Sequence, residues 1–373
     1  MHVVARAGYP NDRADVRSLR LAPAEQTIDG IEYSFAPNRR TLLYSRHPER
    51  YHALAVATLE AQCRRLRPSL LHAASNYNVG LAAIEVGRRL GVPVIYEVRG
   101  LWHVSKAAAS PRYLDSDHYR MVERFEVQAA SAADHVFAIT SGVANVLTAA
   151  GVPATRISLL PNGADLMRFQ AKAADPALAH RLGLDGVVVF GYVGSLNEYE
   201  GVEDLLEAVS RLRRLGVSAA ALVVGEGPAG ARLREQAAEL GLGAGAVFAG
   251  RVPPDDVQKH YALMDAFVLP RKPTLVCELV SPLKPFEAMA MNKCVVASDV
   301  AALSDIVTDG KTGRLFRKGR VEHLTNVLSE LAADKEQRTR LGVASGEWVR
   351  TQRTWDVLSA DVDAVYRRLL GHR

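Results

Sequence analysis

The stretch Leu269–Asp299, LPRKPTLVCELVSPLKPFEAMAMNKCVVASD, organises the interpretation of the whole chain. Its apolar ends predict two buried strands, and the residues between them predict a long loop and a short helix that opens near Pro285. A loop that leads into a helix N-terminus presents unpaired backbone N–H groups and the positive end of the helix dipole. The stretch is therefore suited to binding an anion such as a phosphate.

Charged side chains extend this prediction. Arg271, Lys272 and Lys284 add positive charge to the stretch, and Glu278 and Glu287 add two carboxylates that can accept hydrogen bonds from sugar hydroxyls. Cations for a diphosphate beside acceptors for hydroxyls are the two requirements of a nucleotide-sugar site.

Composition limits the class of protein. At 373 residues the chain exceeds what one hydrophobic core usually serves, so two domains are expected. The net charge of +5 is mild, with 48% hydrophobic and 23% charged residues as in ordinary globular proteins. The arginine-rich stretches at 64–68 and 211–215 favour solvated helix faces over nucleic-acid binding and leave open a weak peripheral contact with an anionic membrane.

Cysteine and histidine patterns indicate neither a disulfide framework nor a metal site. Cys63, Cys277 and Cys294 are few and scattered, and the histidines lack H-x-x-x-H spacing. We expect no metal and no cofactor. The longest uncharged run, 136–155, is interrupted by glycine and proline, and Met1 opens no secretory signal, so we expect a cytoplasmic chain, with the inner face of the membrane as the alternative.

Short apolar segments alternate with amphipathic ones in both halves of the chain. In the first half a helix over 48–66 precedes a strand over 69–73, and the rhythm restarts at Val187 after the polar segment PNGADLMRF, 161–169. This alternation predicts an α/β fold of two Rossmann-like, doubly wound parallel-sheet domains that face a cleft. The predicted units are one domain at 1–169, a second domain at 170–345 and a helix at 346–373 that packs back across the domains.

Two glycine turns follow predicted strands, GYVGS at 191–195 and VGEGP at 224–228. Each is either a tight turn that needs positive φ or a cradle for a phosphate. The sequence has no G-x-x-x-x-G-K-[ST] and no G-x-G-x-x-G, so a P-loop or dinucleotide-binding protein is not indicated.

In their order, the motifs resemble those of a known enzyme family. PNGADLMRF, FGYVGSLNEYEG, VVGEGP, FAGRVPPDDVQKHYALMDAFVLP and PLKPFEAMAMNKCVVASD are similar to motifs of GT-B glycosyltransferases of family four, as are ADHVFAITSGV and GVPATRISLLPNG in the first half. The resemblance implies retaining, metal-independent transfer of a sugar from a nucleoside-diphosphate sugar to a hydroxyl of a glycan or lipid-linked acceptor. It also implies a role in surface polysaccharide or glycoconjugate synthesis.

The resemblance further implies that 1–169 is the acceptor-side domain and 170–345 the nucleotide-sugar domain, and it implies roles for individual residues. Glu287 matches the carboxylate that takes ribose hydroxyls, and Glu278 would contact the sugar, although eight residues separate the two where the family has seven. If a bulge does not absorb the difference, backbone groups of Leu279, Val280 and Ser281 share that role.

The turn after the first glycine motif departs from the family. Gly194 is retained as a donor-binding residue, but Ser195 and Glu200 stand where the family commonly has an arginine and a lysine that grip the diphosphate. Such cations are typically worth ~3 kcal/mol each in the transition state. Arg271 and Lys284 are the candidate catalytic replacements; the alternative is that they are ordinary surface charges.

On the acceptor side, Asn76, Arg99 and Trp102 follow predicted strands and are expected to face the cleft. They are candidates for binding the acceptor or the sugar, with a structural ion pair and a packed indole as the alternative. HVVAR, 2–6, is predicted to be the second strand of the family fold, so the family's first strand and glycine-rich loop are missing from the pattern.

Two other functions stay open. One is a sugar-nucleotide epimerase or hydrolase of the same fold. The other is a catalytically degenerate binding or activating subunit, suggested by Ser195, Glu200 and the missing first strand.

Overall fold

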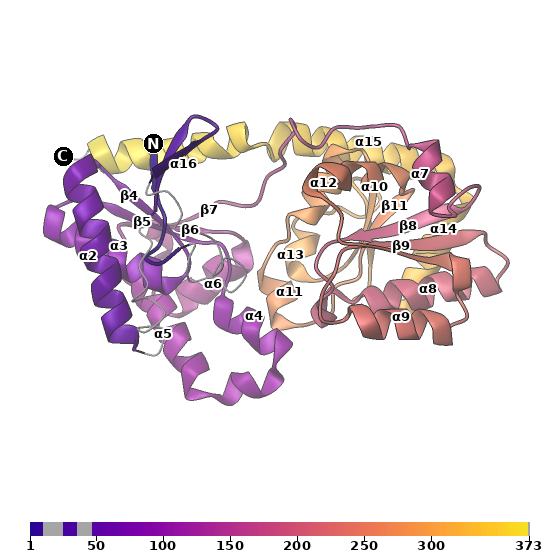
Figure 1. Cartoon of the computed structure of the whole chain (residues 1–373), viewed down its shortest axis with the longest axis horizontal. Coiled ribbons are helices and arrows are strands. Elements are labelled where there is room, and N and C mark those ends of the chain that lie inside the picture. Colours follow the sequence, from indigo (N-terminus) through magenta and orange to yellow (C-terminus); the bar gives the residue numbers. More distant parts are fainter. Residues whose placement is uncertain (10–24, 36–46, 372–373) are drawn as a thin grey trace.

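The computed structural model describes residues 1–9, 25–35 and 47–371. Figure 1 shows two α/β lobes side by side, with the amino-terminal half of the chain in one and the carboxy-terminal half in the other. Each lobe contains a parallel sheet, which confirms the predicted fold class. Within the described ranges, no helix combines the length and the apolar character that a membrane crossing needs.

The amino-terminal lobe contains a four-stranded parallel sheet in the order β4-β5-β6-β7. The strands are β4 (Leu71–Ala74), β5 (Val94–Val98), β6 (His135–Ala138) and β7 (Ile157–Leu159). The helices are α2 (Pro48–Leu66), α3 (Tyr77–Leu90), α4 (Trp102–Ala109), α5 (Asp117–Ala132) and α6 (Ser141–Ala149). Short 3₁₀ turns lie at η1 (Pro111–Asp115) and η2 (Ala154–Arg156). Ser116 and Thr140 begin α5 and α6 by accepting hydrogen bonds from backbone N–H groups of the first turn.

The first strand does not belong to this sheet. β1 (His2–Val4) pairs in parallel with β3 (Ile31–Ser34), which pairs antiparallel with β2 (Glu25–Ile28), and the three form a separate sheet. The prediction of a strand at the start of the chain is confirmed, but its place as a strand of the main sheet is wrong. β1 is only half-buried along its length, whereas four of the five residues of β5 are buried, as expected for a strand covered on both faces.

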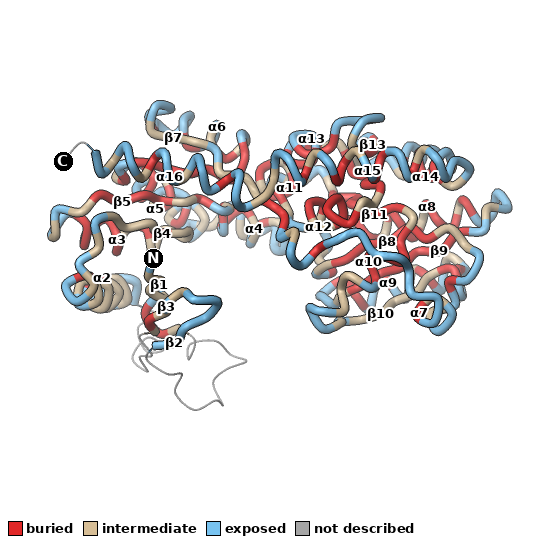
Figure 2. The backbone as a smooth tube through the Cα atoms, turned by 90° about the horizontal axis from the view of Figure 1, so that it is seen from above, coloured by how far each residue is buried: buried red, intermediate tan, exposed pale blue. Residues whose placement is uncertain are grey.

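The carboxy-terminal lobe contains a six-stranded parallel sheet in the order β10-β9-β8-β11-β12-β13. The strands are β8 (Val188–Val193), β9 (Ala219–Val224), β10 (Ala246–Gly250), β11 (Ala266–Leu269), β12 (Cys294–Ser298) and β13 (Arg314–Phe316). Numbered within the lobe, this order is 3-2-1-4-5-6, that of a doubly wound Rossmann sheet, and it reverses between β8 and β11. Every residue of β9, β11 and β12 is buried, and Figure 2 shows β9 and β11 in red.

Helices cover both faces of this sheet (Figure 1). They are α7 (Pro176–Arg181), α8 (Val202–Arg214), α9 (Gly230–Glu239), α10 (Val257–Leu263), α11 (Leu275–Leu279), α12 (Lys284–Ala290), α13 (Ala301–Ser304), α14 (Val321–Ala333) and α15 (Lys335–Gln352). Three further 3₁₀ turns are η3 (Glu198–Glu200), η4 (Gly243–Gly245) and η5 (Pro254–Asp256). Three short helices depart from the sequence prediction: α11 lies inside the segment predicted to be a loop, and α4 and α7 were not predicted.

The last helix crosses back to the first lobe. α15 packs on the carboxy-terminal lobe, the chain bends, and α16 (Trp355–Gly371) runs along the amino-terminal lobe (Figure 1). Val365 of α16 packs against Ile95 of β5 and Phe137 of β6. The Ala164 N–H donates to the Arg353 carbonyl at 2.7 Å and holds the bend against the segment that joins the lobes. The apolar side of α16 therefore covers the four-stranded sheet.

Candidate functional site

The candidate site lies where the strand order of the second sheet reverses. β8 and β11 are hydrogen-bonded neighbours. The connection that leaves β8 leads to β9 on one side of this pair, and the connection that leaves β11 leads to β12 on the other side. In open parallel sheets such a reversal leaves a crevice beyond the carboxyl ends of the two strands, where ligands bind. The turn at Gly194 follows β8, and the loop that begins at Pro270 follows β11.

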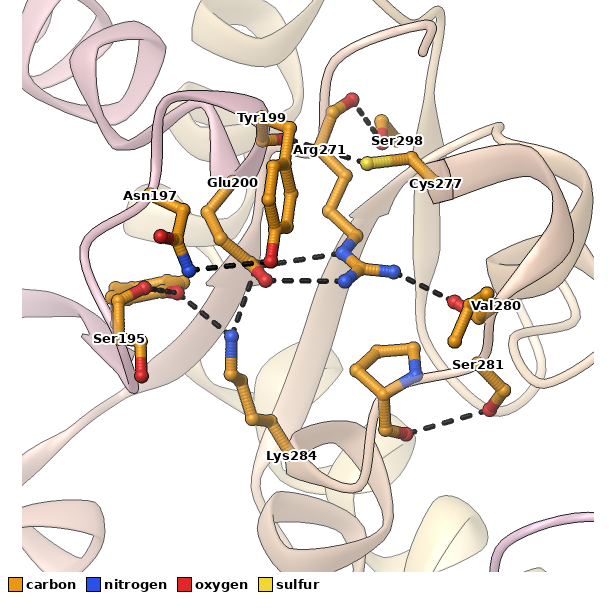
Figure 3. A network of polar contacts seen from close by, with 12 residues as sticks. Ser195, Asn197, Tyr199, Glu200, Arg271, Cys277, Val280, Ser281, Lys284 and Ser298 are labelled. Atoms are coloured by element: carbon orange, nitrogen blue, oxygen red, sulfur yellow. Dashed lines mark hydrogen bonds and ion pairs between the residues drawn. The ribbon is translucent and has the colours of Figure 1, made fainter. Parts of the chain in front are cut away.

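Three charged side chains from these two connections form a buried charge network, which we define as Glu200, Arg271 and Lys284 (Figure 3). Arg271 Nη2 lies 3.1 Å from Glu200 Oε1, and Lys284 Nζ lies 2.9 Å from Glu200 Oε2. The side chains are 6%, 4% and 18% exposed for Arg271, Glu200 and Lys284. Arg271 and Lys284 are therefore not ordinary surface charges, and both have a carboxylate partner that the sequence did not predict.

Lys284 also binds the glycine turn. Its Nζ donates to the Tyr192 hydroxyl at 2.8 Å, and that hydroxyl donates to the Ser195 carbonyl at 3.0 Å. Gly194 has φ of +144°, and a Cβ placed there would lie 2.3 Å from Lys284 Cε. Glycine at this position is thus required both by the backbone and by the lysine that lies against it.

Burial and mutual charge set the protonation of the network. Burial would raise the pKa of Glu200, but the charges of Lys284 and Arg271 outweigh it and hold that pKa below its usual value. Burial also lowers the pKa of Lys284; Glu200 opposes this shift, whereas the nearby Arg271 charge adds to it. Burial alone would lower the pKa of Arg271, yet Glu200 raises it. The protein therefore stabilises the positive charge of Lys284 less than that of Arg271.

Glu287 lies in the first turn of α12, close to the charge network. Its Oε2 accepts a hydrogen bond of 2.9 Å from the Tyr261 hydroxyl, and no described residue is bonded to its Oε1. Burial raises the pKa of Glu287, and Tyr261, Arg168 and Lys284 partly offset the shift. One oxygen is thus oriented by tyrosine while the other can accept a hydroxyl of a ligand.

Glu278 has different surroundings. Its Oε2 accepts from the backbone N–H of Ala301 at 2.8 Å and its Oε1 from Lys318 Nζ at 2.6 Å. The carboxylate of Glu278 therefore binds the first residue of α13, which follows β12, and the lysine that follows β13. The role of Glu278 toward a sugar stays a prediction, and a ligand would have to share or displace these partners.

The three residues after Glu278 have their carbonyl oxygens occupied. Thr140 Oγ1 donates to the Leu279 carbonyl at 2.5 Å, Arg271 Nη1 to the Val280 carbonyl at 2.8 Å, and Asn162 Nδ2 to the Ser281 carbonyl at 2.9 Å. Thr140 and Asn162 come from the amino-terminal half of the chain. This segment is thus a contact between the lobes, and a role of its backbone groups toward the sugar stays a prediction.

The acceptor-side candidates lie on the other lobe. Trp102 begins α4 and is 60% exposed, which excludes a packed indole. The side chain of Arg99 is exposed and has no ion-pair partner among the described residues, and its N–H donates to Ser75 Oγ. Asn76 precedes α3 at the end of β4. Helix α4 contacts α11 and η3, so it lies at the boundary between the lobes, near the charge network.

Sequence reasoning missed the partners that orient this site. Each of four residues binds a predicted site residue: Tyr192, Tyr261, Thr140 and Asn162. All four lie within motifs that resemble the family, but none was itself predicted as a site residue. The role of Glu200 had one available signal. Glu200 stands where the resemblance implies a cation, and Arg271 and Lys284 were already candidates for replacing that charge, so an ion pair between Glu200 and these cations could have been considered.

Known proteins match the chain over nearly its whole length. The model described as Glycosyl transferases group 1 matches residues 180–348, and the model described as Glycosyl transferase 4-like domain matches residues 1–163. A GDP-mannose-dependent alpha-mannosyltransferase of Mycobacterium tuberculosis is 27% identical over 94% of this chain and 85% of its own. A D-inositol 3-phosphate glycosyltransferase of Stackebrandtia nassauensis is 30% identical over 79% of this chain and 68% of its own.

A third relative matches over a shorter region. The GDP-mannose-dependent alpha-(1-6)-phosphatidylinositol monomannoside mannosyltransferase of Mycobacterium tuberculosis is 31% identical over 56% of this chain. The match spans about half of that relative, 55% of its length.

Solved structures share the fold. Sucrose-phosphate synthase from Thermosynechococcus elongatus superposes with a TM-score of 0.77 at 19% identity, over 100% of this chain and 89% of its own. Anabaena HepE in complex with UDP-glucose superposes with a TM-score of 0.73 at 17% identity, over 98% of this chain and 99% of its own.

The two parallel-sheet lobes define the chain as a GT-B protein. It belongs to the group 1 glycosyltransferases, because the family models and the relatives together cover both lobes.

Proposed function

We propose that this chain is a retaining glycosyltransferase that moves a hexose from a nucleoside-diphosphate sugar to a hydroxyl of a glycan or lipid-linked acceptor. The observation that carries the proposal is the charge network at the strand-order reversal, with Lys284 against the Gly194 turn and Glu287 beside it. A cation at the turn suits the diphosphate, and the free oxygen of Glu287 suits a ribose hydroxyl.

The residues would act mainly by positioning and by electrostatic stabilisation. The bond from the sugar to the diphosphate oxygen breaks, and negative charge grows on the leaving diphosphate. Lys284 lies in a largely water-excluded site, where a fixed positive charge stabilises such a transition state more strongly than it would in water. The acceptor oxygen would attack from the face that the leaving group vacates, which retains the anomeric configuration, and its proton would pass to the diphosphate.

Names of the relatives guide the choice of substrates. Two of them are described as GDP-mannose-dependent mannosyltransferases, one of these acting on a phosphatidylinositol mannoside, and HepE was solved with UDP-glucose. We therefore propose GDP-mannose and UDP-glucose as the first donors to test and a lipid-linked sugar as the first acceptor class. A role in surface glycoconjugate synthesis follows from that acceptor class.

The test is turnover by the purified full chain. Each donor is incubated with phosphatidylinositol mannoside and with lipid-free oligosaccharides, and both the nucleoside diphosphate and the glycosylated product are measured. An α-linked product from an α-linked donor would support retention. Free nucleoside diphosphate without a product would instead support a hydrolase. Unchanged rates in excess EDTA would support the proposed metal-independent reaction, and a loss restored by a divalent cation would contradict it.

Glu287→Ala tests the site within the same assay. We expect at least a hundredfold loss of turnover, because the hydroxyl acceptor oriented by Tyr261 is removed. A wild-type rate would refute the assignment of this site.

A non-catalytic role remains a second candidate, because Glu200 lies between the two cations and partly neutralises them. A degenerate subunit would bind nucleoside diphosphates without turning over any donor, or would need a partner chain for turnover. Robust transfer by the isolated chain would exclude it.

A further inference from the structure

The two cations of the charge network do not have equivalent contacts. Arg271 donates from Nε and Nη2 to Glu200, at 3.4 and 3.1 Å, and from Nη1 to the Val280 carbonyl at 2.8 Å. Three of the five N–H bonds of its guanidinium group therefore have protein acceptors, and the side chain is only 6% exposed. A ligand can reach little of Arg271 because so little of its side chain is exposed.

Lys284 keeps a free donor. Its Nζ contacts the Tyr192 hydroxyl and Glu200, which accounts for two of the three N–H bonds of an ammonium group. Within the described part of the chain no acceptor is assigned to the third. Lys284 is also the most exposed of the three side chains, and it lies against the Gly194 turn.

Glu200 is itself held next to Arg271 by backbone contacts. The turn η3 ends at Gly201, whose φ is +70° and whose added Cβ would lie 1.9 Å from the Pro270 carbonyl oxygen. The Lys272 N–H donates to the Tyr199 carbonyl at 3.0 Å. The connections that follow β8 and β11 are thus joined directly at the point where Glu200 meets Arg271.

The Arg271 contact reaches the boundary between the lobes. Arg271 donates a hydrogen bond to the carbonyl of Val280. The two neighbouring carbonyls accept hydrogen bonds from the amino-terminal lobe: Leu279 from Thr140, and Ser281 from Asn162. Arg271 therefore holds the central residue of a three-residue segment on which the amino-terminal lobe docks.

We propose that Glu200 gives the two cations different tasks. It fixes Arg271 as a positioning residue that holds the segment 279–281 for the contact between the lobes, and it leaves Lys284 as the cation that binds the leaving diphosphate. This inference rests on the proposed function and assigns residue roles within the same site. It differs from the expectation that Arg271 and Lys284 share the diphosphate.

Paired variants of the full chain test this division. The first pair is Lys284→Met and Arg271→Met, and the probe is GDP or UDP, whichever raises the melting temperature of the wild-type chain. We expect Lys284→Met to weaken binding of the probe, measured by calorimetry, by at least thirtyfold and to lower kcat. We expect Arg271→Met to weaken binding less than fivefold and to raise KM for the acceptor.

Amide hydrogen exchange separates a positioning role from ligand binding. Arg271→Met should speed exchange in residues 279–281 by at least tenfold, whereas Lys284→Met should leave it near the wild-type rate. Arg271→Lys should restore part of the protection, because a lysine can still reach one acceptor. Lys272→Met is the matched control. Lys272 is the neighbouring lysine, but its Nζ binds Asp204 at 2.7 Å and Glu203 at 3.3 Å on α8. This variant should therefore leave hydrogen exchange in residues 279–281 near the wild-type rate.

Outcomes for the two proposals are distinct. Equal losses of probe affinity in Lys284→Met and Arg271→Met, with unchanged exchange at 279–281, would overturn the division of tasks and leave the proposed function standing. A wild-type chain that binds neither GDP nor UDP and turns over no donor would overturn both. Urea unfolding midpoints for each variant show whether a loss of binding reflects unfolding, and in that case Lys284→Arg and Arg271→Lys provide the comparison.

Discussion

Replacing Gly194 with alanine tests how closely Lys284 lies against the turn. The φ of +144° is rarely adopted by residues with a Cβ, and the added Cβ would lie 2.3 Å from Cε and 2.8 Å from Nζ of Lys284. The backbone strain costs about 1–3 kcal/mol. Displacing Lys284 also removes a charge-assisted hydrogen bond to Glu200, worth about 1.5–3 kcal/mol. We therefore expect Gly194→Ala to lower the free energy of unfolding by about 4 kcal/mol.

A second glycine provides the matched control. Gly241 also has a positive φ, +64°, but nothing lies within 4 Å of a Cβ built there. Gly241→Ala should therefore cost only the backbone term, about 1–2 kcal/mol. The difference between the two variants, about 2–3 kcal/mol, isolates the overlap with Lys284.

The assay is urea-induced unfolding of both variants, combined with calorimetric titration of GDP or UDP. We expect Gly194→Ala to weaken nucleoside-diphosphate binding at least tenfold and Gly241→Ala to leave it unchanged. The reasoning is refuted if both variants lose the same stability, or if Gly194→Ala binds the nucleotide as the wild-type chain does.

Three further predictions concern the rest of the fold. Burial lowers the pKa of His103 to about 4, so between pH 6.5 and 4 the unfolded chain binds this proton more readily than the folded chain. The free energy of unfolding should therefore fall by up to about 3 kcal/mol by pH 4. In His103→Phe, urea unfolding at pH 7 and 4.5 should show a smaller loss of stability in acid than in the wild-type chain. Thr140→Val removes both the cap of α6 and the hydrogen bond to the Leu279 carbonyl, so a loss of about 2 kcal/mol is expected in urea unfolding, whereas Thr140→Ser should stay near the wild-type value. Val365→Asp buries a carboxylate under α16 and should speed tryptic cleavage at the bend before this helix, whereas Val357→Asp, at a 42% exposed position of the same helix, should not.

The regular elements could be predicted because their signals are local. The helix predicted over 48–66 is α2, with Pro48 in its first turn and Arg67 in a left-handed cap before Pro68. Helix α11 has five residues and no side-chain cap, so neither periodicity nor capping distinguishes its sequence LVCEL from an apolar loop. Short helices that are stabilised by tertiary contacts leave no such local signal.

The candidate site could be predicted as a list of residues but not as an arrangement. Arg271 and Lys284 were selected for their charge in the right segment, and the structure places both beyond the sheet edge where β8 and β11 meet. Their partner Glu200 lies 71 residues before Arg271. Only the reversal of strand order brings these two connections together, and hydrophobic periodicity specifies strands without specifying their order.

The departure of the glycine turn from the family pattern is best understood through this arrangement. A lysine at position 200, which the resemblance to the family would predict, would place a third cation beside Arg271 and Lys284 in a buried site, which is strongly unfavourable. Glu200 and the two cations therefore depend on one another and form one compensating set. The set retains one net positive charge, carried by the lysine with the free donor. Glu200 on its own suggests a lost cation, but together with Arg271 and Lys284 it is consistent with a positive site assembled from a different loop.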